Sequence, residues 1–307
     1  MWSFRTLLGV SLLSLASGKY LHYDRAANDE SPPIPVVLWH GMGDSCCNPI
    51  SMGSIKKLVE HTVDGVYVNS LMLGDNLITD TTNGFLANMN DLVANACDQI
   101  AKDEKLQNGY NAVGFSQGGL FLRAVAQRCP HPPMKTLVSI GGPQQGIYGF
   151  PYCPGPTAVC NTVRYLLDFG AYVGFVQNKV VQAQYWHDPN MKDDYKTKNI
   201  FLADLNNANT FNQTYKDNLQ KLKNFVMVKF LRDNMVVPKE SEWFGFYPDN
   251  DDTKVLPMEE TDLYEQDLIG LKEMKEDGKL HFLTVDADHL RLTQDFLVNE
   301  IIKKFLM

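Results

Sequence analysis

Residues 110–119, with the sequence YNAVGFSQGG, hold the combination of residue types best suited to covalent chemistry. An apolar run ends at Ser116, which lies between Gly114 and Gly118. Glycines at these positions are typical of a strand-to-helix turn so tight that larger side chains would clash. Such a turn exposes a serine hydroxyl above the end of a sheet, where it can attack a carbonyl carbon. The pattern therefore predicts that Ser116 is a nucleophile.

A serine nucleophile needs a base, which in this arrangement follows the last strand of the sheet. His289, in the sequence DADHL, falls between the last predicted strand and the last predicted helix. The other histidines beyond the serine are His131 in a proline-rich loop, His187 in an irregular region and His281 within a strand. We therefore predict that His289 is the base.

An acid should orient that base, and it should follow an earlier strand. Asp233 comes directly after the apolar run 225–231 (FVMVKFL) and fits this position. Asp286 and Asp288 are too close in sequence to the histidine to reach its far ring nitrogen easily, so we expect them to cap or solvate a loop. Asp204 is a weaker rival. Asp233 is the predicted acid.

Two backbone N–H groups should stabilise the oxyanion formed in the reaction. One belongs to the residue after the nucleophile, Gln117, and the other to a loop after an early strand. The segment 40–43 (HGMG) follows a buried strand, and its glycines allow close approach of the backbone. We predict Met42 as the second donor, with an ordinary glycine turn as the alternative. His40 is expected to be a hydrogen-bonded structural residue.

These roles predict a reaction without a metal or organic cofactor. His289 would take the proton of Ser116, the serine would form an acyl-enzyme, and water activated by the same histidine would hydrolyse it. Asp233 would hold the ring in the required tautomer.

Alternating strand and helix patterns must position these groups. They predict an α/β fold with a mostly parallel sheet and helices on both faces. The expected strands are 35–40, 65–71, 110–115, 135–140, 225–231 and 280–285, and the expected helices are 50–62, 86–103, 118–128 and 291–305. We expect residues 19–307 to form a single domain with an insertion at about 141–224.

The insertion contains apolar residues at helical spacing between 163 and 186. They include Val163, Leu166, Leu167, Val173, Val176 and Val180, with Phe169, Tyr172 and Phe175 among them. Such helices could roof a groove for a fatty acyl chain, or they could complete the core. Periodicity alone leaves both open.

The first 18 residues read as a secretory signal peptide. Arg5 precedes a short apolar stretch, 6–15, and the small residues 16–18 form a cleavage site. No later segment has the length and apolarity of a membrane helix. The net charge of −8 argues against nucleic acid or an anionic membrane as a partner.

Export would place six cysteines in an oxidising compartment. Spacing favours a Cys153–Cys160 disulfide, and Cys97 and Cys129 could bridge two predicted helices. The adjacent pair Cys46 and Cys47 would need a strained ring, and a zinc site is a weak rival without supporting spacing. The sequon Asn212-Gln213-Thr214 predicts a glycosylated surface site.

The chain resembles the palmitoyl-protein thioesterase family of lysosomal hydrolases in the α/β-hydrolase superfamily. The resemblance rests on WHGMGDSCCNP, GYNAVGFSQGG, FVMVKFLRD, SEWFGFY and DHLRL, and it spans nearly all of the chain after Pro35. It implies that Ser116, Asp233 and His289 are catalytic, that an acyl groove lies beneath the insertion, and that Cys46–Cys47, Cys97–Cys129 and Cys153–Cys160 are disulfides. Family members commonly carry more sequons than this chain.

The resemblance implies removal of long-chain acyl groups, such as palmitoyl, from S-acylated cysteines of proteins or peptides, in the lysosomal lumen or after secretion. The alternative is a secreted lipase or carboxylesterase that uses the same residues on oxygen esters. A lipid-binding protein on a hydrolase scaffold is the non-enzymatic alternative, and the oligomeric state is left open.

Overall fold

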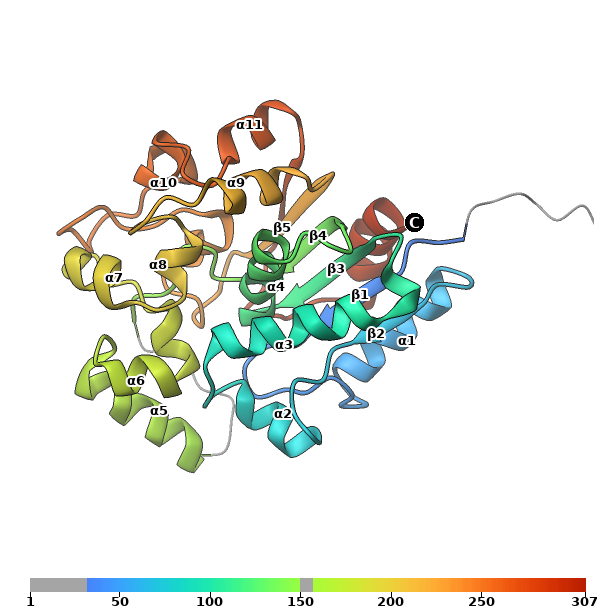
Figure 1. Ribbon diagram of the computed structural model, residues 1–307, viewed down its shortest axis with the longest axis horizontal. Coiled ribbons are helices and arrows are strands. Elements are labelled where there is room, and N and C mark those ends of the chain that lie inside the picture. The colour runs from blue at the N-terminus through green and yellow to red at the C-terminus, as the bar shows by residue number, and fades with distance from the viewer. Residues whose placement is uncertain (1–31, 150–156) are drawn as a thin grey trace, which may run out of the picture. The chain divides into compact units, whose positions relative to one another are not determined.

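A computed structural model describes residues 32–149 and 157–307 of the chain (Figure 1). The predicted signal peptide and Cys153 lie outside these residues. No helix in the described ranges is long and apolar enough to span a bilayer.

A six-stranded, entirely parallel sheet forms the centre of the fold, with strand order β2-β1-β3-β4-β5-β6 (Figure 1). The strands are β1 Val36–Trp39, β2 Val68–Ser70, β3 Tyr110–Phe115, β4 Met134–Ile140, β5 Asn224–Phe230 and β6 Leu280–Val285. All six predicted strands are present. β2 is shorter than its predicted range of 65–71. The carboxyl ends of parallel strands meet at one edge of a sheet, so the loops after β1, β3, β5 and β6 open on the same side.

Helices cover both faces of this sheet. On β1, Val37 and Trp39 join one apolar cluster, and Val36 and Leu38 join the other, as the twofold alternation of a strand requires. Helices α3 (Met89–Lys102) and α4 (Gln117–Arg128) pack in the first cluster. Helix α1 (Met52–Thr62) and the C-terminal π-helix η5 (Leu297–Leu306) pack in the second. The predicted α/β architecture is confirmed.

Shorter helices connect these elements. They are α2 Leu77–Asn83, η1 Glu104–Leu106, α5 Thr157–Gly170, α6 Gly174–Lys179, η2 Val181–Tyr185, α7 Lys192–Lys198, α8 Leu202–Leu205, α9 Gln213–Gln220, η3 Lys239–Trp243, η4 Met258–Glu260, α10 Asp262–Glu265, α11 Leu271–Glu276 and α12 Gln294–Phe296.

Two predicted helical segments differ from the structure. The closing helix starts at Gln294 rather than at 291, because Thr293 caps it by accepting a hydrogen bond from the N–H of Phe296. The apolar run 163–186 is broken into α5, α6 and η2. Gly170, at φ 143°, ends the first of these, in a conformation that other residues rarely adopt.

Candidate active site

The turn between β3 and α4 holds Ser116 in a strained conformation. Its φ is 54° and its ψ is −129°, a region that costs a residue with a side chain roughly 1–3 kcal/mol. A Cβ atom on Gly114 would lie 2.2 Å from the carbonyl oxygen of Gly118, and one on Gly118 would lie 2.6 Å from that of Trp39, so neither position has room for a larger residue. The glycines flanking the serine therefore permit the predicted turn, and the strain positions the hydroxyl above the sheet.

Three loops bring the predicted nucleophile, base and acid together. The Nε2 atom of His289, after β6, lies 2.9 Å from the Oγ atom of Ser116. Its Nδ1 atom is hydrogen-bonded to the Oδ2 atom of Asp233, after β5. The side chain of Asp233 is fully buried, and that of His289 is 8% exposed. This arrangement can pass the serine proton to the imidazole while the carboxylate holds the ring in place.

Asp233 is held as a carboxylate. Burial raises its pKa, but hydrogen bonds from His289 and Glu242 and from the backbone outweigh burial and lower the pKa to about 2. The backbone N–H groups of Met235 and Val236 donate to its Oδ1 atom at 2.7 and 3.0 Å. The carboxylate is therefore charged, oriented and available to the imidazole over a wide pH range.

The loop after β1 lies directly against the nucleophile turn. A Cβ atom on Gly41 would lie only 3.0 Å from the Cβ atom of Ser116. Within the described residues, the N–H groups of Met42 and Gln117 have no internal hydrogen-bond acceptor. Two free N–H groups beside a nucleophile are what an oxyanion hole needs.

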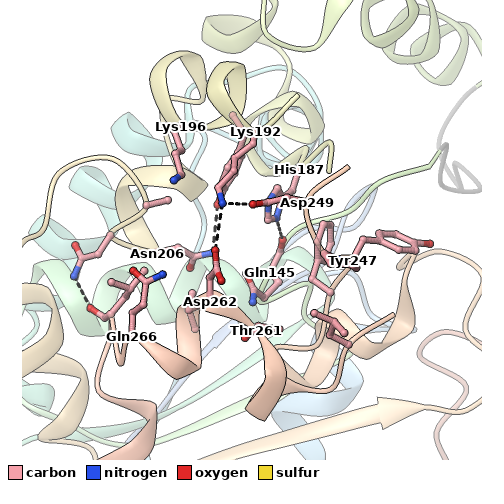
Figure 2. Close-up of a pocket in the computed structure, with 18 of the residues that line it drawn as sticks. Gln145, His187, Lys192, Lys196, Asn206, Tyr247, Asp249, Thr261, Asp262 and Gln266 are labelled. Atoms are coloured by element: carbon pink, nitrogen blue, oxygen red, sulfur yellow. Dashed lines mark hydrogen bonds and ion pairs between the residues drawn. The ribbon is translucent and has the colours of Figure 1, made fainter. Parts of the chain in front are cut away.

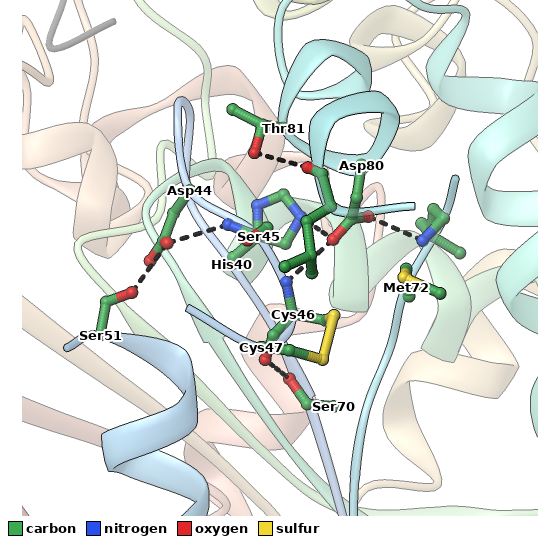
Figure 3. The surroundings of a disulfide bond; sticks show 12 residues. His40, Asp44, Ser45, Cys46, Cys47, Ser51, Ser70, Met72, Asp80 and Thr81 are labelled. Carbon is green, nitrogen blue, oxygen red and sulfur yellow. Dashed lines mark hydrogen bonds and ion pairs between the residues drawn. A yellow bond between two sulfur atoms is a disulfide. The ribbon is translucent and has the colours of Figure 1, made fainter. Parts of the chain in front are cut away.

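A disulfide and a buried carboxylate brace this loop (Figure 3). Cys46 and Cys47 are bonded to each other. The carboxylate of Asp80 accepts hydrogen bonds from the N–H groups of Cys46, at 2.8 Å, and Leu73, at 2.7 Å. His40 is fully buried, with its Nε2 atom 3.4 Å from Asp80. The predicted structural role of His40 thus agrees with its position behind the loop.

The rival candidates lie in other surroundings. The ring of His187 stacks against Tyr195 and Phe246, at centroid distances of 3.8 and 4.2 Å, and His281 contacts Asn224. Among the acids, Asp204 forms an ion pair with Arg128 at 2.8 Å and Asp286 one with Arg232. Asp288 accepts a hydrogen bond from the N–H of His289, the loop-capping role expected of it. His131 is exposed.

A cavity of about 620 Å³ opens beside Ser116 and His289. Apolar side chains form much of its wall: Ile50, Met52, Ile55, Leu290, Leu292 and Leu297. In the described part of the chain, none of its lining residues comes from the insertion. The volume and the apolar lining suit an apolar hydrocarbon chain more than a bulky polar ligand.

The insertion reaches the site in a different way. Val163, Leu167, Val176 and Val180 are buried in a cluster with Phe85, and Met42 packs against that cluster. The Nε2 atom of Gln182 contacts the sulfur of Met42 at 3.1 Å and donates to the carbonyl of Gly84 at 3.1 Å. The same carbonyl accepts from the side chain of Gln117 at 3.0 Å. The apolar residues of the insertion thus complete a core. The acyl groove beneath the insertion remains a prediction.

A second cavity, of about 590 Å³, lies beside His187 and contains none of the predicted catalytic residues (Figure 2). Lys192 forms ion pairs there with Asp249 and Asp262. Burial lowers the pKa of His187 to about 4, against the opposing effect of the carbonyl of Gln145, and therefore keeps the ring neutral. Among the residues that the structure describes, this lining includes no serine or cysteine.

Glu242 was not predicted from the sequence as a site residue, yet it lies against Asp233. It is 1% exposed, and one of its oxygens accepts a hydrogen bond from the N–H of Phe230 at 2.8 Å. The one signal in the sequence is an acidic residue inside the aromatic run EWFGFY.

Of the other predicted covalent features, the disulfide between Cys97, within α3, and Cys129, directly after α4, is present. The third predicted pair includes Cys153, outside the described residues. Asn212 of the sequon precedes α9 and is partly exposed.

Known proteins are similar to this chain over most of its length. The palmitoyl protein thioesterase family matches residues 35–289. Palmitoyl-protein thioesterase 1 of Caenorhabditis elegans is 61% identical over 89% of this chain and 92% of its own length. Palmitoyl-protein thioesterase 3 of Dictyostelium discoideum is 34% identical, over 83% and 84%, and the mouse lysosomal thioesterase PPT2 is 27% identical, over 80% and 78%. The chain belongs to the palmitoyl protein thioesterase family.

Proposed function

We propose that this thioester hydrolase removes long-chain acyl groups from S-acylated cysteines with Ser116 as nucleophile, His289 as base and Asp233 as the acid that orients it. The supporting observation is the continuous line of hydrogen bonds from Asp233 through His289 to the Ser116 hydroxyl. Family membership makes the chain a thioesterase. The residue roles rest on the geometry.

The reaction has two halves. Ser116 attacks the thioester carbonyl as His289 takes its proton, and the N–H groups of Met42 and Gln117 stabilise the oxyanion. His289 then protonates the departing cysteine thiolate. In the second half it activates a water molecule, which hydrolyses the acyl-enzyme and releases the fatty acid.

The cavity beside Ser116 supports an apolar acyl substrate. Its walls carry Ile55, Leu292 and Leu297, and its volume of about 620 Å³ leaves room for a hydrocarbon chain next to the hydroxyl. The protein or peptide that carries the cysteine would remain outside, because only the scissile bond must reach Ser116.

We propose that residues 19–307 form one domain with an insertion at about 141–224, and that the mature chain works in the lysosomal lumen. Named lysosomal thioesterases among its relatives support this location. The partly exposed Asn212 would carry the N-glycan.

A comparison of Ser116→Ala with wild type tests the assignment. The variant should lose kcat for a palmitoyl thioester by at least about 10³-fold while its thermal unfolding midpoint is kept. Unchanged turnover would refute the role of Ser116. Measuring kcat/KM for a palmitoyl thioester and its matched oxygen ester separates the thioesterase from the esterase alternative, and a strong oxyester preference would favour the alternative.

A further inference from the structure

Glu242 occupies an unusual position behind the proposed catalytic acid. One carboxylate oxygen of Glu242, one of Asp233 and a ring nitrogen of His289 all lie within 4.8 Å of one another. The Glu242 side chain is 1% exposed, so water does not solvate its charge. Two carboxylates this close and this buried cannot both be ionised without a large electrostatic cost.

The hydrogen-bond partners of Glu242 show where a proton is needed. Its Oε2 atom accepts from the N–H of Phe230 at 2.8 Å. Its Oε1 atom is buried and meets no hydrogen-bond donor among the described residues. An ionised carboxylate would leave that oxygen unsatisfied, whereas a protonated one can donate from it to an acceptor. The acceptor at hand is the carboxylate of Asp233.

The segment that carries Glu242 is held on both sides. Ser241 donates from its hydroxyl to the carbonyl of Gly146 at 2.6 Å, and the indole N–H of Trp243 donates to the carbonyl of Met227 at 3.0 Å. These bonds fasten η3 to the loop after β4 and to β5. The backbone on either side of Glu242 is therefore fixed, and the bond from the Phe230 N–H holds its carboxyl group.

We propose that Glu242 is a positioning residue that stays protonated and donates a hydrogen bond to the Asp233 carboxylate, thereby extending the activity of the enzyme to lower pH. The donated bond draws negative charge away from Asp233. A less negative Asp233 stabilises positive charge on the imidazole less, so catalysis should persist in more acidic solution. The inference rests on the proposed role of His289.

The charged groups around Glu242 agree with this protonation. Burial, followed by the hydrogen bond and charge of Asp233, raises the pKa of Glu242 well above its usual value. Lys229 on β5 acts in the opposite direction. The ammonium of Lys229 also faces Glu240 and Lys239 of η3 and lies 4.0 Å from the ring centroid of Trp243. On its other side, Asp233 is hydrogen-bonded to the ring of His289.

Two substitutions separate the donated hydrogen bond from the volume of the side chain. Glu242→Gln keeps both functions, because the amide can donate to Asp233 and accept from Phe230 N–H. Glu242→Met has similar volume and no donor. Glu240→Gln is the matched control, since it removes a charge from the same short helix without facing Asp233.

The first measurement is kcat/KM against pH for a palmitoyl thioester. Glu242→Met should move the acid limb of the profile upward by about one pH unit, while Glu242→Gln and Glu240→Gln should stay near wild type. A folded Glu242→Met variant with the wild-type acid limb would overturn the proposal.

The second measurement does not depend on turnover or on the methionine variant. An infrared difference spectrum between wild type and Glu242→Gln at neutral pH should contain the C=O stretch of a protonated carboxyl group in wild type only. Absence of that band would overturn the proposal, even if the Ser116→Ala result supports the proposed catalytic roles.

Discussion

Gly118 is the position where one added methyl group should disable the site without touching a catalytic side chain. A Cβ atom there would lie 2.6 Å from the carbonyl oxygen of Trp39 and 2.7 Å from that of His40. Both are backbone atoms at the end of β1, directly before the loop with Met42. Ordinary van der Waals contact begins at 3.4 Å, so full relief of the Gly118→Ala clash would move the start of α4 and this loop apart by about 0.8 Å.

That separation would widen the gap between the N–H groups of Met42 and Gln117. A displacement approaching 1 Å costs on the order of 10²-fold in rate, so kcat for a palmitoyl thioester should fall about 10²-fold. Gly174→Ala is the matched control, because a Cβ atom at Gly174 meets nothing within 4 Å. It should keep the wild-type kcat.

Steady-state kinetics would be measured beside thermal unfolding, so that loss of fold is distinguished from loss of geometry. A folded Gly118→Ala protein with kcat within about threefold of wild type would show that the close packing of these two loops does not position the oxyanion donors.

Two further predictions concern stability. Arg123 is fully buried and donates to Gln144 O and Asn206 Oδ1, both at 2.9 Å, so Arg123→Met should lower the free energy of unfolding in urea by about 3 kcal/mol, and a loss below about 1 kcal/mol would contradict this. The pKa of Asp233 is depressed from 3.8 to about 2, so its stabilisation is present above about pH 4 and is lost as pH falls towards 2. The stability difference between wild type and Asp233→Asn should therefore shrink by on the order of 2 kcal/mol across this window, and a difference independent of pH would count against it.

The three proposed catalytic residues could be predicted from the sequence because their order along the chain and the ends of the apolar runs can be read from it directly. Each of Ser116, Asp233 and His289 follows an apolar run that becomes a strand, and parallel strands end at one edge of the sheet. The order of the strands was therefore enough to predict that these three residues converge.

Glu242 could not be predicted in this way. Its contact with Asp233 arises because η3 turns back against the end of β5, where the N–H of Phe230 holds its carboxyl group. No periodicity in 233–243 encodes that turn. The end of α5 at Gly170 was not predicted for a similar reason. The helical spacing of apolar residues continues past the glycine, whereas the backbone leaves the helical conformation there.

Gln182 connects the insertion to the loops that carry the two proposed oxyanion donors. Its amide contacts Met42 and shares the Gly84 carbonyl with Gln117, so one side chain from outside the central sheet touches the supports of both proposed oxyanion donors. Exchange of the insertion between relatives would consequently also replace a contact that lies behind the proposed oxyanion donors. A chimera that lacks an equivalent amide would lose the side chain that contacts both Met42 and the Gly84 carbonyl.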